Sequence, residues 1–299
     1  LKENTAIIID TKNINTKALH QYLLAIVAPR PIAFVSSMDA KGNVNLAPFS
    51  FFNCFSSNPP IVVFSANRRV ADNTTKDTLA NVIETGECVI NAVSYPIVRQ
   101  MALCSIDYPN GVNEFEKSGL TPIASTIVKP PRVKECLAQL ECKVTQIIPL
   151  GEDGGAGNLV ICEVVQIHVD ESIIDERNRI DPDKIDLMGR MGRLYYARAS
   201  GDAVYTIHQP VQPIPIGFDM LPEHFIKSKI LTANDLGALA SVEKMPEADE
   251  LIAFAKEENI KAILDAEDYN EKLQHHAHQL LIEDNKLEAF MTMMMTTVQ

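Results

Sequence analysis

Residues suited to binding chemistry are concentrated between positions 30 and 53, in the sequence RPIAFVSSMDAKGNVNLAPFSFFN. Two hydroxyl residues, Ser36 and Ser37, follow an apolar run. Residues 47–53 (APFSFFN), which we predict to form a loop, combine three phenylalanines with a hydroxyl and an amide. A flat ring ligand needs apolar contacts on its faces, and its polar edges or a phosphate need hydrogen-bond donors. The stretch therefore indicates either a site for a flat, phosphate-bearing ligand or a hairpin whose phenylalanines fill the core.

A second candidate site is the predicted start of a helix at residues 73–78 (NTTKDT). Thr74 and Asp77 have the three-residue spacing of a capping box, and Gly86 is a suitable helix stop. The first N–H groups of a helix, its dipole and a nearby lysine, here Lys76, also favour a bound phosphate. The residues alone favour capping over phosphate binding, although one segment can serve both purposes.

No arrangement typical of nucleophilic or acid–base catalysis stands out. The sequence shows no Ser-His-Asp or Cys-His pattern and no paired carboxylates, so no catalytic side chain is predicted. His168 lies in an apolar predicted strand, where a hydrogen-bonded core histidine is favoured over a catalytic one. Residues 189–196 (GRMGRLYY) are basic, aromatic and glycine-bearing, which indicates a ligand border, a dimer interface or closure of a barrel.

The elements that must position these residues are predicted to be mostly strands. Runs rich in β-branched and aromatic residues are bounded by turn residues, and they occur at 32–37, 44–47, 61–64, 87–93, 137–150 and 158–169. The glycines at 155–157 precede a strand, whereas a dinucleotide-binding fold requires a helix there. About six strands with hairpin-like connections predict an antiparallel barrel rather than a parallel α/β sheet.

The composition of the chain changes after a proline-rich divider at 210–215 (PVQPIP). We therefore predict a binding domain at 1–209 and an α-helical extension of unknown role at 210–299. His275, His276 and His278 lie near Glu283 and Asp284 in this extension. A solvated helix face is favoured over a metal site there, because their spacing does not bring these groups to one helix face, so no metal is predicted.

Composition excludes several classes of protein. The chain has 299 residues and a net charge of −12, which argues against nucleic acid as a partner. No run of about 18 apolar residues is present, so no membrane span is predicted. Six scattered cysteines without a C-x-x-C motif indicate buried thiols in a reducing, cytoplasmic compartment.

Several stretches resemble the flavin reductase-like family, whose members have an FMN-binding split β-barrel and include flavoredoxins. The resemblance is carried, in the family's order, by residues 30–53 and by NPPIVVFSAN, KDTLANVIETGECVINAV, FEKSGLTPIAS, VKPPRVKECLAQLECKV, LVICEVVQIHVDE and GRMGRLYYARAS. It covers roughly residues 5–200. Ordered matches over that length are far more specific than any single motif.

The resemblance implies a mainly β fold: an antiparallel, Greek-key-like split barrel with flanking helices. The C-terminal α-helical extension predicted above lies outside this core. It implies FMN bound in a homodimer, NADH or NADPH as reductant, and a small-molecule or protein electron acceptor. The residues implied to hold the flavin ring and ribityl chain are Arg30, Ser36, Ser37, Ala47, Pro48, Phe49, Ser50, Phe51, Phe52 and Asn53, and those implied to hold its phosphate are Lys76, Asp77 and Thr78.

Three functions are compatible with this resemblance. The favoured one is an FMN-dependent reductase, in which the cofactor performs the redox chemistry and the protein orients it. The second is a flavoredoxin-type electron carrier without its own NADH or NADPH site. The third, from a different class, is a non-catalytic flavin-binding module whose helical tail recruits a partner.

Overall fold

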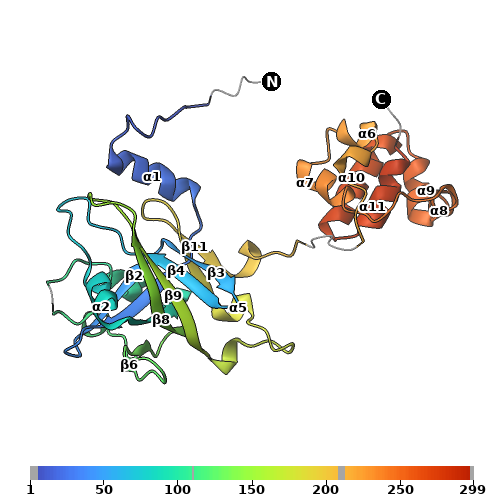
Figure 1. Cartoon of the computed structure of the whole chain (residues 1–299). Helices are drawn as coiled ribbons and strands as arrows, with labels where there is room; N and C mark the ends of the chain where they lie inside the picture. Colours follow the sequence, from blue (N-terminus) through green and yellow to red (C-terminus); the bar gives the residue numbers. More distant parts are fainter. Residues whose placement is uncertain (1–5, 110, 208–212, 297–299) are drawn as a thin grey trace. The chain divides into compact units, whose positions relative to one another are not determined.

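The computed structural model describes residues 6–109, 111–207 and 213–296, which form two compact units (Figure 1). The barrel unit is Leu1–Tyr205 and the helical unit is Thr206–Gln299, so the boundary lies close to the predicted one between 209 and 210. The proline-rich divider at 210–215 lies partly outside the described residues. Across the described ranges, no helix is long and apolar enough to cross a membrane.

The barrel unit is built on a seven-stranded sheet in which every neighbouring pair of strands is antiparallel. This confirms the predicted antiparallel arrangement. In spatial order the strands are β2 (Val44–Phe49), β1 (Ala33–Met38), β5 (Glu87–Ala92), β8 (Ala138–Pro149), β9 (Asn158–Val169), β4 (Pro60–Ser65) and β3 (Phe52–Ser57).

Five consecutive residues of β1, Ala33–Ser37, are buried. Successive side chains of a strand point in opposite directions, so both faces of β1 are buried. Ala33 and Val35 belong to a core that also contains Phe64 and the helix α2 (Asp77–Thr85). Phe34 belongs to a second core, formed with α3 (Val98–Leu103) and α4 (Glu114–Ser118). Two cores therefore fix the position of β1.

Further short helices and strands complete the barrel unit, and the described part of the helical unit contains six α-helices. In the barrel unit they are α1 (Thr16–Ile26), β6 (Pro122–Ile123), β7 (Arg132–Val133), α5 (Pro182–Ile185), β10 (Leu187–Arg190) and β11 (Tyr196–Ala199). In the helical unit they are α6 (Glu223–Ile226), α7 (Ala233–Leu239), α8 (Ala248–Phe254), α9 (Glu258–Leu264), α10 (Tyr269–Ile282) and α11 (Lys286–Met294). The predicted C-terminal helical extension is thus confirmed.

Two of the three clustered histidines of the helical unit, His275 and His278, make side-chain contacts within it. His278 Nδ1 lies 2.9 Å from Asp235 Oδ2, which also accepts the Thr232 N–H in the capping box of α7. His275 lies 3.8 Å from Glu271 on the same helix. Among the described residues, no group of three or more His, Cys, Asp or Glu side chains is arranged to hold a metal ion.

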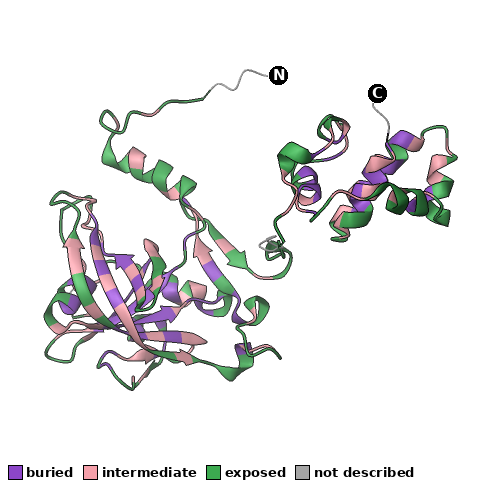
Figure 2. Cartoon of the chain, turned by 45° about the vertical axis from the view of Figure 1, so that its right-hand side comes forward, coloured by how far each residue is buried: buried purple, intermediate pink, exposed green. Residues whose placement is uncertain are grey.

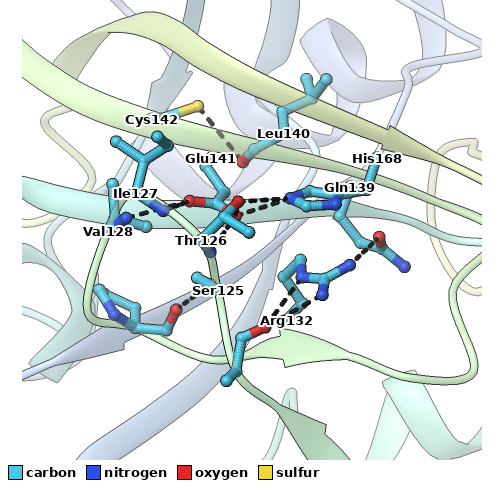
Figure 3. A network of polar contacts seen from close by, with 12 residues as sticks. Ser125, Thr126, Ile127, Val128, Arg132, Gln139, Leu140, Glu141, Cys142 and His168 are labelled. Carbon is cyan, nitrogen blue, oxygen red and sulfur yellow. Dashed lines mark hydrogen bonds and ion pairs between the residues drawn. The ribbon is translucent and has the colours of Figure 1, made fainter.

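A buried carboxylate on β8 anchors the loop that precedes β7 (Figure 3). Glu141 is fully buried and accepts hydrogen bonds from the backbone N–H groups of Thr126, Ile127 and Val128 at 2.6–3.0 Å. Its Oε1 also lies 2.6 Å from His168 Nε2. Burial alone would raise the pKa of Glu141, but the hydrogen bonds from these N–H groups and from the Thr126 hydroxyl outweigh it and lower the pKa to about 2.

Replacing Glu141 with glutamine is expected to lower the unfolding free energy at pH 7 by about 3 kcal/mol, the equivalent of a pKa lowered from 4.5 to about 2. Because the pKa is lower in the folded state, this stabilisation is complete above about pH 4.5 and is lost as the pH falls towards 2. Urea unfolding followed by tyrosine fluorescence measures the loss in the barrel unit, which contains six of the seven tyrosines.

The matched control is Glu135→Gln. Glu135 is half-buried and its carboxylate accepts one backbone N–H, that of Thr121, at 3.0 and 3.1 Å. This substitution should cost less than about 1.5 kcal/mol. Equal losses for the two variants, or a loss for Glu141→Gln that does not shrink in acid, would contradict the anchoring role of Glu141.

Candidate functional site

The start of helix α2 presents backbone donors that no side chain caps. Lys76 occupies the N-cap position and makes no side-chain cap hydrogen bond. The predicted capping box of Thr74 and Asp77 is wrong, because the Thr74 hydroxyl donates to Asp72 Oδ1 at 2.7 Å and accepts from Arg69 Nη1 at 2.9 Å. The predicted stop is confirmed, since Gly86 ends the helix with a left-handed φ of 68°. The first turn of α2 is therefore available to an anion.

Two cations lie beside this helix start. Arg69 donates from Nε and Nη2 to Asp107 Oδ1 at 3.1 and 3.0 Å, and this hydrogen bond raises the pKa of Arg69. Lys76 Nζ lies 4.0 Å from the same oxygen and 5.9 Å from the centre of the Phe49 ring. A cationic side chain over an aromatic ring next to free helix N–H groups suits a phosphate attached to a flat ring.

The loop between β8 and β9 holds the backbone of Arg68 and Arg69 in place. Arg68 N donates to Ala156 O at 2.9 Å, and Gly155 N donates to Arg68 O at 3.0 Å. A Cβ atom at Gly154 would lie only 3.0 Å from the carbonyl oxygen of Arg69. The glycines of this predicted hairpin loop therefore permit the close approach that positions Arg69.

Hydrogen bonds attach α2 to β1 and β2. Asn45 Nδ2 donates to Thr78 Oγ1 at 2.8 Å, and Asn81 Nδ2 donates to Ser37 Oγ at 3.1 Å. The Thr78 and Ser37 side chains are fully buried in these contacts. Of the predicted phosphate residues, Thr78 therefore contributes its hydroxyl to the attachment of the helix and only its backbone to the first turn.

The hydroxyl of Ser36 points to the other face of β1, where it donates to the carbonyl oxygen of Pro131. Ser36 and Ser37 were both predicted to hold the flavin ring or ribityl chain, and the alternation of side chains along a strand places them on opposite faces of β1. Both hydroxyls are buried and bonded within the protein.

The predicted aromatic loop at 47–53 is shorter in the structure. Ala47, Pro48 and Phe49 belong to β2, and Phe52 and Asn53 begin the edge strand β3, so Ser50 and Phe51 alone connect the strands. Phe49 is buried against Phe64, with ring centres 5.2 Å apart. Phe51 and Phe52 are half-buried and Asn53 is exposed. The loop prediction was wrong for residues 47–49 and 52–53, because residues 47–49 pair with β1 and residues 52–53 pair with β4.

Arg30 is buried and ties three segments together. Its guanidinium donates to the carbonyl oxygens of Leu24 and Val27 at the end of α1 and to that of Met191 after β10. Its Nε lies 3.4 Å from Ser50 Oγ. Burial and the nearby charge of Arg190 lower the pKa of Arg30. Arg30 therefore organises the surroundings of the β2–β3 connection.

An apolar cavity of about 350 Å³ adjoins Arg30. Its walls come from the lead into β1 and from β3, β5, β8, β10 and β11, and include Ile32, Phe52, Ile90, Leu140 and Met188. Arg30 and Arg190 also exchange both backbone hydrogen bonds, at 3.0 and 2.8 Å. The segment at 189–196 thus lies against the lead into β1, and its Gly189 lines the cavity, so barrel closure, a ligand border and a dimer interface all remain predictions for it.

The structure brings the two predicted groups of residues into contact. Phe49, at the end of β2, pairs in register with Ala33 at the start of β1, and Lys76 lies over its ring. Sequence reasoning missed four contributors: Asn45, Arg69, Asn81 and Asp107. The basic pair Arg68-Arg69 in the segment before α2 was an available signal. Asp107 gave none, because its contact with Arg69 spans 38 positions.

The fold and the site residues described above agree with a known family of proteins. The family model of the flavin reductase like domain matches residues 27–199, so the chain belongs to the flavin reductase-like family, and the expected split barrel is confirmed. The matched residues end before the helical unit begins.

Similar proteins include an uncharacterised protein of Aquifex aeolicus, 39% identical over 191 residues, which are 64% of this chain and 95% of that protein. Nitrilotriacetate monooxygenase component B from Bacillus cereus is 33% identical, with a TM-score of 0.62 over 67% of this chain and 98% of that one. The 2-nitrobenzoate 2-nitroreductase NbaA of Pseudomonas fluorescens is 29% identical, with a TM-score of 0.60 over 73% and 99% of the two chains.

Proposed function

We propose that the protein is an FMN-dependent oxidoreductase of the flavin reductase-like family. When bound, FMN supplies the redox chemistry by accepting a hydride from NADH or NADPH and passing electrons to a small-molecule or protein acceptor. The observation that carries the proposal is the uncapped start of α2, where Lys76 lies over the Phe49 ring and shares Asp107 with Arg69. The oxidoreductase names of two similar proteins support the class of reaction.

The residues at the start of α2 and those that line the cavity beside Arg30 fit the chemical parts of FMN. A phosphate needs N–H donors and cations, and the first turn of α2 with Lys76 supplies both. A flat ring needs apolar surface, which Phe49, Phe52 and the 350 Å³ cavity supply. We assign the Lys76 side chain and the backbone N–H groups of Asp77 and Thr78 to the phosphate, and the segment 47–53 to the ring and ribityl chain.

The other predicted residues have supporting roles in this proposal. Ser36 contacts Pro131, and Ser37 contacts Asn81 of α2, so these buried hydroxyls hold β1 against its neighbours. The Arg30 guanidinium holds α1 through the carbonyl oxygen of Leu24. They orient the groups that meet the flavin.

We also propose a cytoplasmic location, because all six cysteines are free thiols, as expected in a reducing compartment.

A homodimer is part of the proposal. Helix α1 has no buried residue, and Figure 2 shows it in the colours of exposed and intermediate residues near the N-terminal mark. Its apolar side chains include Leu23, 49% exposed, and Ile26, 77% exposed. An amphipathic helix without a covered apolar face needs a partner surface, and a second copy of this chain is the partner we propose.

Light scattering at micromolar concentration is expected to give twice the chain mass of 33.1 kDa. Ile26→Asp should shift the protein towards the monomer, because it would place a charge in an apolar interface. Ile282→Asp, at a position 65% exposed in the helical unit, is the matched control and should leave the mass unchanged. A monomeric wild-type protein would refute the dimer.

Lys76→Ala should weaken FMN binding by roughly ten-fold to a hundred-fold, because a charge-assisted contact is worth about 1.5–3 kcal/mol. Riboflavin lacks the phosphate, so its affinity should change much less. Flavin fluorescence quenching during titration of apoprotein measures both affinities. If Lys76 is only a solvated first-turn residue, neither affinity changes; that result, or equal losses for the two flavins, would remove Lys76 from the phosphate site.

A further inference from the structure

The two cations at the start of α2 share one carboxylate. Asp107 Oδ1 accepts from Arg69 at 3.0 and 3.1 Å and lies 4.0 Å from Lys76 Nζ. The Asp107 side chain is 61% exposed, whereas those of Arg69 and Lys76 are 27% and 29% exposed. The anion is therefore the most solvated member of the group, and it lies on the outer side of two partly covered cations.

Arg69 has further contacts that do not depend on Asp107. Its Nη1 donates to Thr74 Oγ1 at 2.9 Å and to the Thr75 carbonyl oxygen at 2.8 Å. Its backbone carbonyl oxygen accepts from Asn73 N at 2.9 Å, and its N–H donates to Thr74 O at 2.8 Å. The guanidinium is thus held in place from the loop side, and the loss of Asp107 leaves these contacts intact.

The groups that Asp107 contacts are the groups that the proposed function assigns to, or places beside, a phosphate. Lys76 precedes the uncapped first turn of α2, and Arg69 is anchored to the segment that leads into it. A carboxylate and a phosphate are both anions that accept hydrogen bonds from these cations, so the two compete for them and repel each other. Exposed ion pairs contribute little, so the Asp107 contacts can be exchanged at low cost.

We propose that Asp107 is an anionic gate: its carboxylate takes the position of the flavin phosphate between Arg69 and Lys76, and FMN must displace it to bind. This inference rests on the proposed function and deepens it. The gate lowers the affinity for a phosphorylated flavin and leaves the affinity for a flavin without a phosphate nearly unchanged. It therefore favours exchange of FMN with solution over permanent retention.

The test is Asp107→Asn, which removes the charge and keeps the size of the side chain. FMN should bind about five-fold more tightly than to the wild type, the equivalent of an exposed charge interaction of about 1 kcal/mol. Riboflavin affinity should stay the same within about two-fold, and the gain for FMN should shrink in high salt because the effect is electrostatic. Fluorescence quenching with full-length apoprotein provides these affinities, and Asp107→Ala serves as a second variant.

Asp72→Asn is the matched control. Asp72 lies between Arg69 and Lys76 in the sequence, and its charge also acts on Arg69. Its carboxylate, however, accepts hydrogen bonds from Thr74 N and Thr74 Oγ1 at 3.0 and 2.7 Å. The Asp72→Asn substitution also removes one negative charge, but it leaves the contacts of Asp107 with Arg69 and Lys76 intact. FMN affinity of this variant should change by less than about two-fold.

The outcomes separate the gate from the proposed function. FMN binding that depends on Lys76 but is unchanged or weaker in both Asp107 variants overturns the gate and leaves the proposed function standing. An equal gain for riboflavin, or for Asp72→Asn, also overturns it. A wild-type protein that binds neither flavin overturns both proposals together.

Discussion

The burial of β1 on both faces is the constraint on which the rest of the barrel unit depends. Its side chains alternate between the core that contains α2 and the core that contains α3 and α4. The strand cannot shift by one residue without exchanging every side chain between these cores. Because β2 pairs with β1 over its whole length, Phe49 and Asn45 are fixed as well, and through Asn45 so is the start of α2.

The uncapped helix start is informative because the helical unit shows the alternative. In α7, Thr232 and Asp235 form a complete capping box, and His278 supports Asp235. In α2 the N-cap residue is Lys76, which makes no capping hydrogen bond, and the helix is held from its side by Asn45 and Asn81 instead. This arrangement fixes the direction of the first N–H groups while leaving them available, which is the preorganisation that anion binding requires.

The sequence predicted what depends on local pattern. Strands such as β4 and β9 follow from runs of β-branched residues, and Gly86 identified the end of α2. Contacts between distant positions could not be predicted: the anchoring of the 126–128 loop by Glu141, and the sharing of Asp107 by Arg69 and Lys76, follow from tertiary packing. The capping box failed for a related reason, because Arg69 and Asp72 engage the Thr74 hydroxyl.

The central claim is that the residues around the start of α2 bind FMN for electron transfer from a reduced nicotinamide. Steady-state oxidation of NADH and NADPH by the purified protein, with and without added FMN, tests it most directly. We predict a protein that purifies yellow or binds added FMN, and that oxidises at least one nicotinamide much faster than free FMN does. Binding of FMN without such oxidation would indicate an electron carrier or a binding module, and a colourless protein that neither binds FMN nor oxidises either nicotinamide would contradict the account.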